Sequence, residues 1–135
     1  MRILVLAVGR LRPPFADDVA HYEKLLSGHA RVELVELREG AKVMGRIPER
    51  AHVVLLDGGG RQMSSEQLAE WLEQRRQSGL DLCFVVGGPR GLVLERSDTK
   101  LSFGPITLPH QLARVVLLEQ LYRAHKILAR EPYHY

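Results

Sequence analysis

The stretch Asp81-Leu82-Cys83-Phe84-Val85-Val86, followed at once by Gly87-Gly88, decides the fold class. Five apolar residues in a row, bounded by a charge on one side and by glycine on the other, are typical of a short buried strand. A strand that is apolar at every position is covered on both faces, which is the situation in parallel sheets. The stretch therefore predicts a central strand of a mainly parallel sheet.

Further strands are predicted on either side of this one. Three more runs have the composition and length of strands: Arg2 to Val8, Arg31 to Leu37 and His52 to Asp57. The last run leads into Gly58-Gly59-Gly60, which we interpret as a turn that follows the strand. A weaker segment, Lys100 to Leu108, shows strand character in Ile106-Thr107-Leu108.

Helices are predicted between the strands. Apolar residues at three- and four-residue spacing indicate three helices, over about Asp17 to Leu26, Ser65 to Gly79 and His110 to Ala129. Ser64 and Gln67 have the spacing of a capping box at the start of the second helix. Residues 38–50 are polar and broken by glycine and proline, which predicts a loop with at most a short helical turn. The alternation of elements predicts one α/β domain over residues 1–135, with helices flanking a mainly parallel sheet.

Length and composition exclude several classes of protein. The 135 residues suit one domain, and 45% hydrophobic with 26% charged residues is typical of a globular chain. The longest apolar run, Ile3 to Val8, is far shorter than the roughly 20 residues of a membrane-spanning helix. No export signal follows from the N-terminal residues, so we expect a cytoplasmic protein without a membrane partner. The single cysteine, Cys83, predicts a buried apolar side chain and no zinc site, and we expect no metal.

The glycines indicate where a ligand binds. Ligands of parallel sheets collect beyond the carboxyl ends of the strands, and glycine-bearing loops follow several of the predicted strands. The sequence contains neither the G-x-G-x-x-G of dinucleotide-binding proteins after the first strand nor the G-x-x-x-x-G-K-[ST] of P-loop proteins. H-E-x-x-H, C-x-x-C and G-x-S-x-G are also missing. The pattern therefore favours a small molecule that lies against backbone, without naming it.

Several spaced motifs, in order, carry a family resemblance over essentially the whole chain. They are Ile3 to Gly9, Leu56-Asp57, Leu82 to Leu92, Ile106 to Val115, Glu119 to Ala124 and Pro132 to His134. With these motifs the chain resembles the RlmH family, the small single-domain SPOUT methyltransferases that modify a pseudouridine of 23S rRNA. The resemblance implies S-adenosylmethionine as methyl donor, a homodimer, and methylation of N3 of a pseudouridine in helix 69 on assembled ribosomes. It also implies a C-terminal trefoil knot, a feature that general rules of chain topology would exclude.

The resemblance also implies site residues. It places the cofactor pocket at Leu56, Gly88, Gly104, Pro105, Ile106, Thr107, Leu108 and Pro109. Apolar walls and closely approaching backbone suit an adenosine group. A core strand over Ile106 to Leu108 is the alternative interpretation from the residues alone.

Methyl transfer to N3 needs removal of the N3 proton and stabilisation of charge on the neighbouring carbonyl groups. Side chains of suitable type near the motifs predict the catalytic set His110, Glu119, Arg123 and His134, with His134 or His110 assisting deprotonation. We expect RNA contacts from Arg114, Arg123, Arg130 and Tyr133. The alternatives are an exposed ion pair for Glu119 and Arg123, a helix cap for His110 and a frayed tail for residues 133–134.

Some features depart from the family pattern. Residues 38–50 look shortened, which puts in doubt an RNA contact from a helix in this segment, and Arg90 stands where an acidic or polar residue is common. Two alternatives to the family's reaction stay open. One is a SPOUT methyltransferase that acts on another RNA such as tRNA, and the other is a nucleotide-binding α/β module without catalytic activity.

Overall fold

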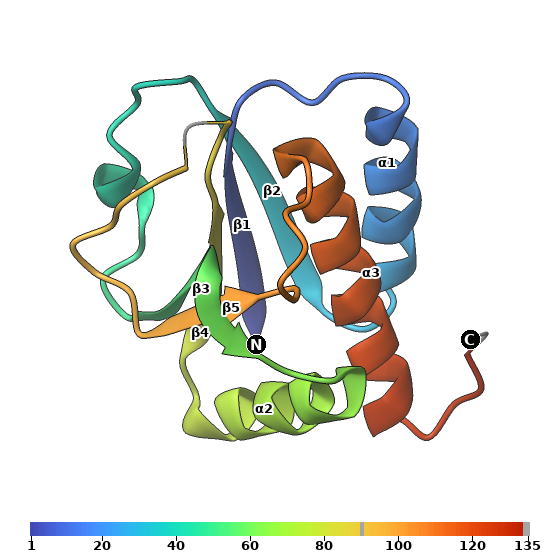
Figure 1. Cartoon of the computed structure of the whole chain (residues 1–135). Coiled ribbons are helices and arrows are strands. Elements are labelled where there is room, and N and C mark those ends of the chain that lie inside the picture. Colours follow the sequence, from blue (N-terminus) through green and yellow to red (C-terminus); the bar gives the residue numbers. More distant parts are fainter. Residues whose placement is uncertain (90, 134–135) are drawn as a thin grey trace.

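Five parallel strands form one sheet in the computed structural model, which describes residues 1–89 and 91–133 (Figure 1). The strands are β1 (Arg2–Val8), β2 (Arg31–Leu37), β3 (Ala51–Gln62), β4 (Asp81–Val86) and β5 (Thr99–Ser102). Their order across the sheet is β2-β1-β4-β3-β5, and every neighbouring pair is parallel. The stretch that predicted a central strand is β4, which lies in the middle of the sheet between β1 and β3.

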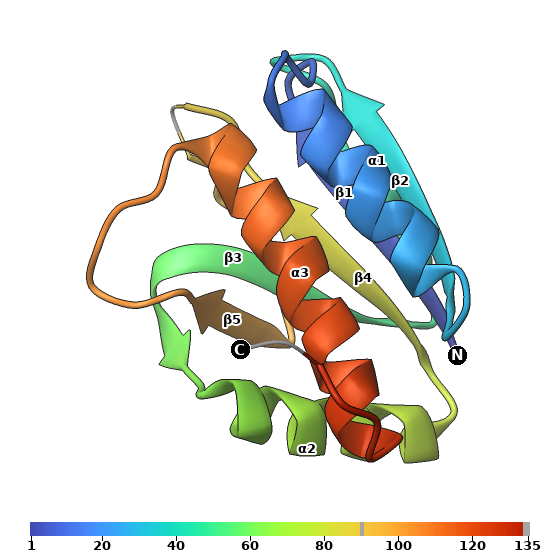
Figure 2. The same ribbon diagram turned by 90° about the vertical axis from the view of Figure 1, so that its right-hand side faces the viewer.

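Three α-helices pack on one face of the sheet. They are α1 (Phe15–Leu26), α2 (Ser65–Ser78) and α3 (His110–Leu128). Figure 2 shows α1 and α3 side by side in front of the strands, with α2 beyond the lower end of the sheet. Leu117, Leu118 and Leu121 of α3 are all buried in the core beneath the helices. The capping box is confirmed: Gln67 N–H donates to Ser64 Oγ, and Ser64 N–H donates to Gln67 Oε1.

The opposite face of the sheet is covered differently. Its apolar residues pack against Val43 and Ile47, which belong to or follow the short 3-10 helix η1 (Val43–Arg46), and against the partly buried Leu92 and Leu94. The prediction of a loop with a short helical turn over residues 38–50 is thereby confirmed. Cys83 is completely buried on this face, and burial raises the pKa of its thiol to about 11. Cys83 is therefore a core residue, as predicted.

The glycine cluster after the third predicted strand is part of β3 rather than a turn. β3 continues to Gln62, with a register shift against β5 between Leu56 and Arg61. A Cβ atom on Gly60 would lie 2.6 Å from the carbonyl carbon of Lys100, so only glycine permits this approach of two backbones. The sequence-based interpretation was wrong because glycine marks close backbone contact as well as turns.

The last predicted strand is also displaced. The strand is Thr99–Ser102, whereas Ile106 lies in a loop with 75% of its surface exposed. Ser102 turns the chain out of the sheet, because its hydroxyl donates to Gly104 O and accepts from Gly104 N–H. Gly104 has a φ of +114°, a conformation that favours glycine. The core-strand alternative for Ile106 to Leu108 is therefore contradicted.

The predicted class, a parallel sheet flanked by helices, is confirmed. The trefoil knot stays a prediction. Among the described residues, no helix combines the length and the apolar character that crossing a membrane requires.

Candidate active site

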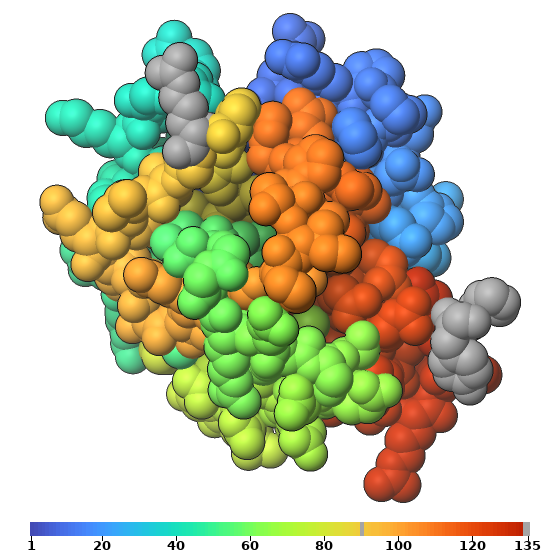
Figure 3. Space-filling model, in the orientation of Figure 1, coloured from blue at the N-terminus to red at the C-terminus, as the bar shows by residue number. Residues whose placement is uncertain are grey.

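A cavity of about 470 Å³ opens at the carboxyl end of β4, beside the middle of β3. Its walls come from the end of β4, from the middle of β3 and from the loop between β5 and α3. Figure 3 shows its surroundings on the surface, where the loop before α3, in orange, lies beside the glycine-rich part of β3, in green. The cavity thus lies at the edge of the sheet where the sequence predicts a ligand.

The predicted cofactor residues gather around this cavity. Seven of the eight line it: Leu56, Gly88, Gly104, Pro105, Ile106, Thr107 and Leu108. The eighth, Pro109, precedes the first residue of α3. Because residues 104–109 form a loop, their peptide groups are not engaged in a strand ladder. The cavity therefore offers apolar side chains and backbone groups outside the strand ladder, which are features that hold an adenosine.

His110 is the first residue of α3 and lines the same cavity. Burial and the charges of Arg114 and Arg12 lower the pKa of His110, against the smaller opposing effect of Glu39. The imidazole is therefore neutral at neutral pH and has a nitrogen lone pair that can accept a proton. Pro109 is the N-cap residue of α3, and no side-chain hydrogen bond caps the helix there.

Arg114 was predicted to contact RNA, but the structure buries it. Only 5% of its surface is exposed, and its Nη2 donates to Val8 O at 2.9 Å and to Gly9 O at 2.7 Å. The guanidinium therefore binds the end of β1 within the chain. It points to backbone carbonyl groups and not to solvent, where RNA would be.

Gln111 also binds main-chain atoms within the chain, at Arg10 and Arg12. The sequence analysis did not predict this role. Its Oε1 accepts from Arg12 N–H at 2.8 Å and its Nε2 donates to Arg10 O at 2.8 Å, while only 6% of the residue is exposed. A glutamine next to a predicted cavity residue is a weak signal, since glutamine is common on exposed helix faces. Only its burial reveals the role.

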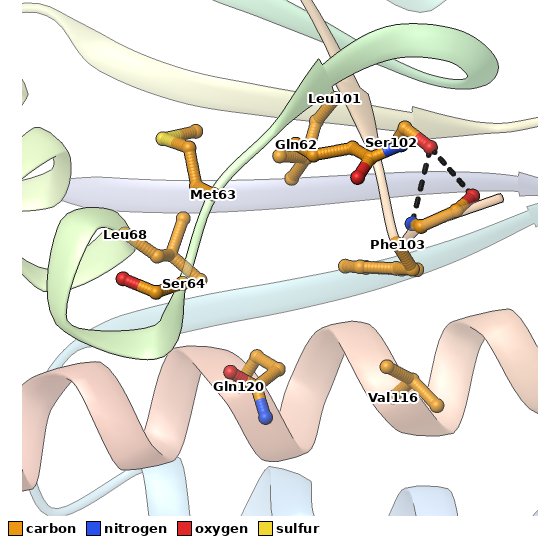
Figure 4. A pocket seen from close by; sticks show the side chains of 10 residues that line it. Gln62, Met63, Ser64, Leu68, Leu101, Ser102, Phe103, Val116 and Gln120 are labelled. Atoms are coloured by element: carbon orange, nitrogen blue, oxygen red, sulfur yellow. Dashed lines mark hydrogen bonds between the residues drawn. The ribbon is translucent and has the colours of Figure 1, made fainter.

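A second cavity of about 410 Å³ adjoins the first and shares the segment Leu101 to Gly104 with it. Figure 4 shows Gln62 and Met63 at the end of β3 on one side and Val116 and Gln120 of α3 on the other. Gln120 forms two side-chain hydrogen bonds beside this cavity. Its Oε1 accepts from Ser65 Oγ at 2.6 Å, and its Nε2 donates to Glu119 Oε1 at 2.6 Å.

Glu119 belongs to a cluster with Arg123 and Tyr133. Arg123 Nη2 lies 2.9 Å from Glu119 Oε2, and Tyr133 Oη donates to the same oxygen at 3.1 Å. The Arg123 guanidinium lies over the Tyr133 ring, 4.6 Å from its centroid. Burial and the Glu119 carboxylate raise the pKa of Tyr133 to about 12. Tyr133 is therefore packed on α3, in contrast to the frayed tail that was the alternative interpretation.

The predicted catalytic residues fall into two groups along α3. Glu119 lies nine positions after His110, and Arg123 lies thirteen positions after His110. At about 1.5 Å per residue, these spacings correspond to about 14 and about 20 Å along the helix axis. Arg130 follows α3, is exposed, and has a φ of +56°. His134 lies outside the described residues. Within one chain, His110 and the Glu119 cluster thus lie at separate places on the helix.

Metal chemistry has no candidate centre within residues 1–89 and 91–133. No group of three or more histidine, cysteine, aspartate or glutamate side chains is arranged there to hold an ion. The two cavities are lined by apolar, amide, hydroxyl and imidazole groups, with Asp57 as a carboxylate.

Comparison with known proteins extends over the whole chain. A family model described as "Predicted SPOUT methyltransferase" matches residues 1–134. Proteins named ribosomal RNA large subunit methyltransferase H from Stenotrophomonas maltophilia, Xanthomonas campestris and Carboxydothermus hydrogenoformans are 44%, 41% and 38% identical, and each alignment covers 99% of both chains. These alignments run over 154, 154 and 158 residues, so the relatives contain positions without a counterpart among the 135 residues here.

A solved structure has the same fold. The crystal structure of TrmJ from Z. mobilis ZM4 matches with a TM-score of 0.56 at 12% sequence identity, over 98% of this chain and 72% of that one. The two chains therefore share a fold. The family model identifies the family within that fold. The chain belongs to the SPOUT methyltransferases and, among them, to the RlmH family.

Proposed function

We propose that this methyltransferase transfers a methyl group from S-adenosylmethionine to N3 of a pseudouridine in helix 69 of 23S rRNA, on assembled ribosomes in the cytoplasm. One observation carries the proposal. In a chain of the RlmH family, the loop Gly104 to Pro109 and the neutral imidazole of His110 meet at one cavity at the edge of the sheet.

The cavity has the chemistry that the donor needs. Leu56, Ile106 and Leu108 would enclose the adenine, and the backbone of Gly88 and Gly104 would approach the sugar closely. S-adenosylmethionine, when bound, supplies an activated methyl group on a sulfonium. The protein's part is then to hold donor and acceptor in line, which by itself removes much of the barrier.

In this proposal a histidine accepts the proton from N3. His110 is neutral and lies at the cavity, so it can accept the proton directly or through a water. His134 is the second candidate for this role. Arg123 carries a positive charge that can stabilise the negative charge developing on the carbonyl groups of the base. Arg130 and Tyr133 remain our candidates for contacts to the RNA.

A homodimer is part of the proposal. In one chain His110 and the Glu119 cluster are separated by about 14 Å along α3, so a second copy offers a way to bring both groups to one acceptor. The exposed apolar residues Ile127 and Leu128 near the end of α3 are available for such a contact.

The test supplies labelled S-adenosylmethionine to the protein with assembled ribosomes, free 23S rRNA or bulk tRNA, all from a strain that lacks the activity. We expect label only in the assembled ribosomes, at one pseudouridine. Label in tRNA would move the substrate to another RNA. No label despite measurable donor binding would favour a nucleotide-binding module without catalytic activity.

A second measurement tests the residues. His110→Ala and His134→Ala are compared in the same assay, with donor binding measured separately. We expect one of them to lose turnover while it keeps donor binding. Full turnover in both variants would remove histidine from the proton transfer.

A further inference from the structure

The segment that joins β1 to α1 is held by side chains of α3, in addition to the end of β2, where Gly9 N–H donates to Leu37 O at 2.8 Å. Four hydrogen bonds run from two buried side chains of α3 to main-chain atoms of residues 8–12. Arg114 binds the carbonyl groups of Val8 and Gly9, and Gln111 binds both Arg10 O and Arg12 N–H. These bonds fix the path of the backbone relative to the first turn of α3.

The arrangement is unusual because of what it buries. Burial of an arginine without an ion pair costs desolvation energy, and this burial lowers the pKa of Arg114, while the Glu36 carboxylate opposes the shift in part. Backbone carbonyl groups are its only partners among the described residues. The two hydrogen bonds that offset this cost also fix the position of the segment.

The segment carries two exposed arginines, Arg10 and Arg12. Gln111 binds main-chain atoms of both residues, so their Cα positions are fixed while both residues remain exposed. The charge of Arg12 acts on His110, which lines the proposed donor cavity. The segment therefore lies beside the site and projects positive charge from its rim.

Two carboxylates lie near this pair, Glu36 on β2 and Glu39 after it. Glu36 accepts from Leu11 N–H at 3.3 Å, and Glu39 lies against Gly88, where its charge acts on the pKa of His110 in the opposite direction to that of Arg12. No ion pair of Arg10 or Arg12 with a carboxylate occurs within the described residues. Arg38, which follows β2 at the same edge of the sheet, adds a further exposed cation.

We propose that Arg10 and Arg12 bind phosphate groups of the RNA that flanks the target nucleotide, and that Gln111 and Arg114 are positioning residues that hold these two arginines at the rim of the site. This inference rests on the proposed function, because it names the contact that brings the RNA to the donor cavity. Guanidinium groups form paired hydrogen bonds with phosphate oxygens, and backbone contacts of this kind set the register of a nucleic acid without reading its sequence.

The first test compares two charge-matched double variants. The clamp variant, Arg10→Gln with Arg12→Gln, removes the two arginines that we propose bind phosphate. The control variant, Arg31→Gln with Arg50→Gln, removes two exposed arginines at the opposite end of the strands, where β2 and β3 begin. Binding to assembled ribosomes is measured at several salt concentrations, and donor binding is measured separately. Loss of two phosphate contacts should reduce the slope of log affinity against log salt by about 1.4 to 1.8 in the clamp variant only.

The outcomes separate this inference from the proposed function. A clamp variant whose affinity and salt slope match those of the control variant overturns the inference, even if the unsubstituted protein methylates ribosomes. Absence of methyl transfer by the unsubstituted protein contradicts the proposed function instead, since the binding experiment does not depend on turnover. Weaker donor binding in the clamp variant would also count against the inference, because the proposed contact is to RNA alone.

A second test addresses positioning. Gln111→Ala keeps both arginines but releases their main chain, whereas Gln111→Glu can still accept from Arg12 N–H. We expect Gln111→Ala to raise KM for ribosomes at least five-fold with little change in kcat or donor binding, and Gln111→Glu to restore part of that loss. Equal falls in kcat with an unchanged KM would contradict the positioning role.

Discussion

The two ends of α3 each carry an arginine, and the two arginines are held in opposite ways. Arg114, near the start of the helix, binds backbone carbonyl groups of residues more than a hundred positions away. Arg123, near the end, binds a carboxylate on its own helix and lies over the ring of Tyr133. The first arginine is 5% exposed, and the side chain of the second is 24% exposed.

The difference shows what fixes the role of a charged residue. A guanidinium that is buried on backbone groups maintains the fold, because its removal leaves carbonyl groups without a donor. A guanidinium on a partly exposed carboxylate contributes little to stability and stays available for a ligand. Arg114 therefore belongs to the architecture of the site, whereas Arg123 remains available for the role proposed for it above.

The largest effect is expected from Arg114→Met, which keeps the volume of the side chain and removes its hydrogen bonds. Two carbonyl groups at the end of β1 lose their donor, so the free energy of unfolding should fall by about 3 kcal/mol. Urea denaturation measures this value, with Arg123→Met as the matched control. An equal, small loss in both variants would remove the distinction between the two ends of α3.

Gln111→Ala should have the next largest effect on stability. Arg12 N–H and Arg10 O lose their partner, although water can partly replace it, so a loss of about 1 to 2 kcal/mol is expected. Hydrogen exchange of the Arg12 amide provides a local measurement, and it should accelerate more than exchange in the middle of β4. Unchanged protection of this amide would show that the segment is held by other contacts.

At the other end of the helix, Glu119→Gln and Arg123→Gln should reduce methyl transfer while they change the stability of the fold only slightly. We expect at least a ten-fold fall in methyl transfer, about 1.4 kcal/mol, because the charge near the acceptor changes. The free energy of unfolding should change by less than about 1 kcal/mol, since the pair is partly exposed and four residues apart. Loss of stability without loss of turnover would instead make the cluster structural.

The smallest effect concerns pH and the histidine near the end of α3. Burial lowers the pKa of His125, whose Nδ1–H donates to Leu121 O at 2.7 Å. The unfolded chain therefore binds the proton more tightly than the folded one, and stability is complete above about pH 6.5 and falls as the pH decreases below it.

His125→Gln should lose less stability than the unsubstituted protein between pH 7 and pH 5, by under about 1 kcal/mol. Thermal unfolding at both pH values measures the difference. Part of the acid loss should persist, because His52 and His110 also have lowered pKa values. The same pH dependence in both proteins would show that His125 contributes nothing to it.

Much of the fold could be predicted because its signals are local. The boundaries of β2 and β4 agree with the predicted strands, and the cap at Ser64 depends on a residue three positions away. The two wrong predictions, Gly58–Gly60 as a turn and Ile106–Leu108 as a strand, both concern the pairing of β3 with β5. Strand pairing depends on residues about forty positions apart, which local pattern does not contain.

The site was predictable to a different degree. The resemblance to the family predicted the residues of one cavity, since residues of the loop after Gly104 and His110 both line it. The role of Gln111 could not be predicted, since its partners are Arg10 and Arg12 at the other end of the chain.

The sequence by itself determined the classes of element, their order and the family, because apolar spacing, caps and motifs are properties of neighbouring residues. Only the tertiary structure decided which polar side chains of α3 are buried and which remain available. The reason is physical: burial of a polar group is stable only if a hydrogen-bonding partner arrives from elsewhere in the chain. For Arg114 that partner is the end of β1, and for Arg123 it is a side chain one helical turn away.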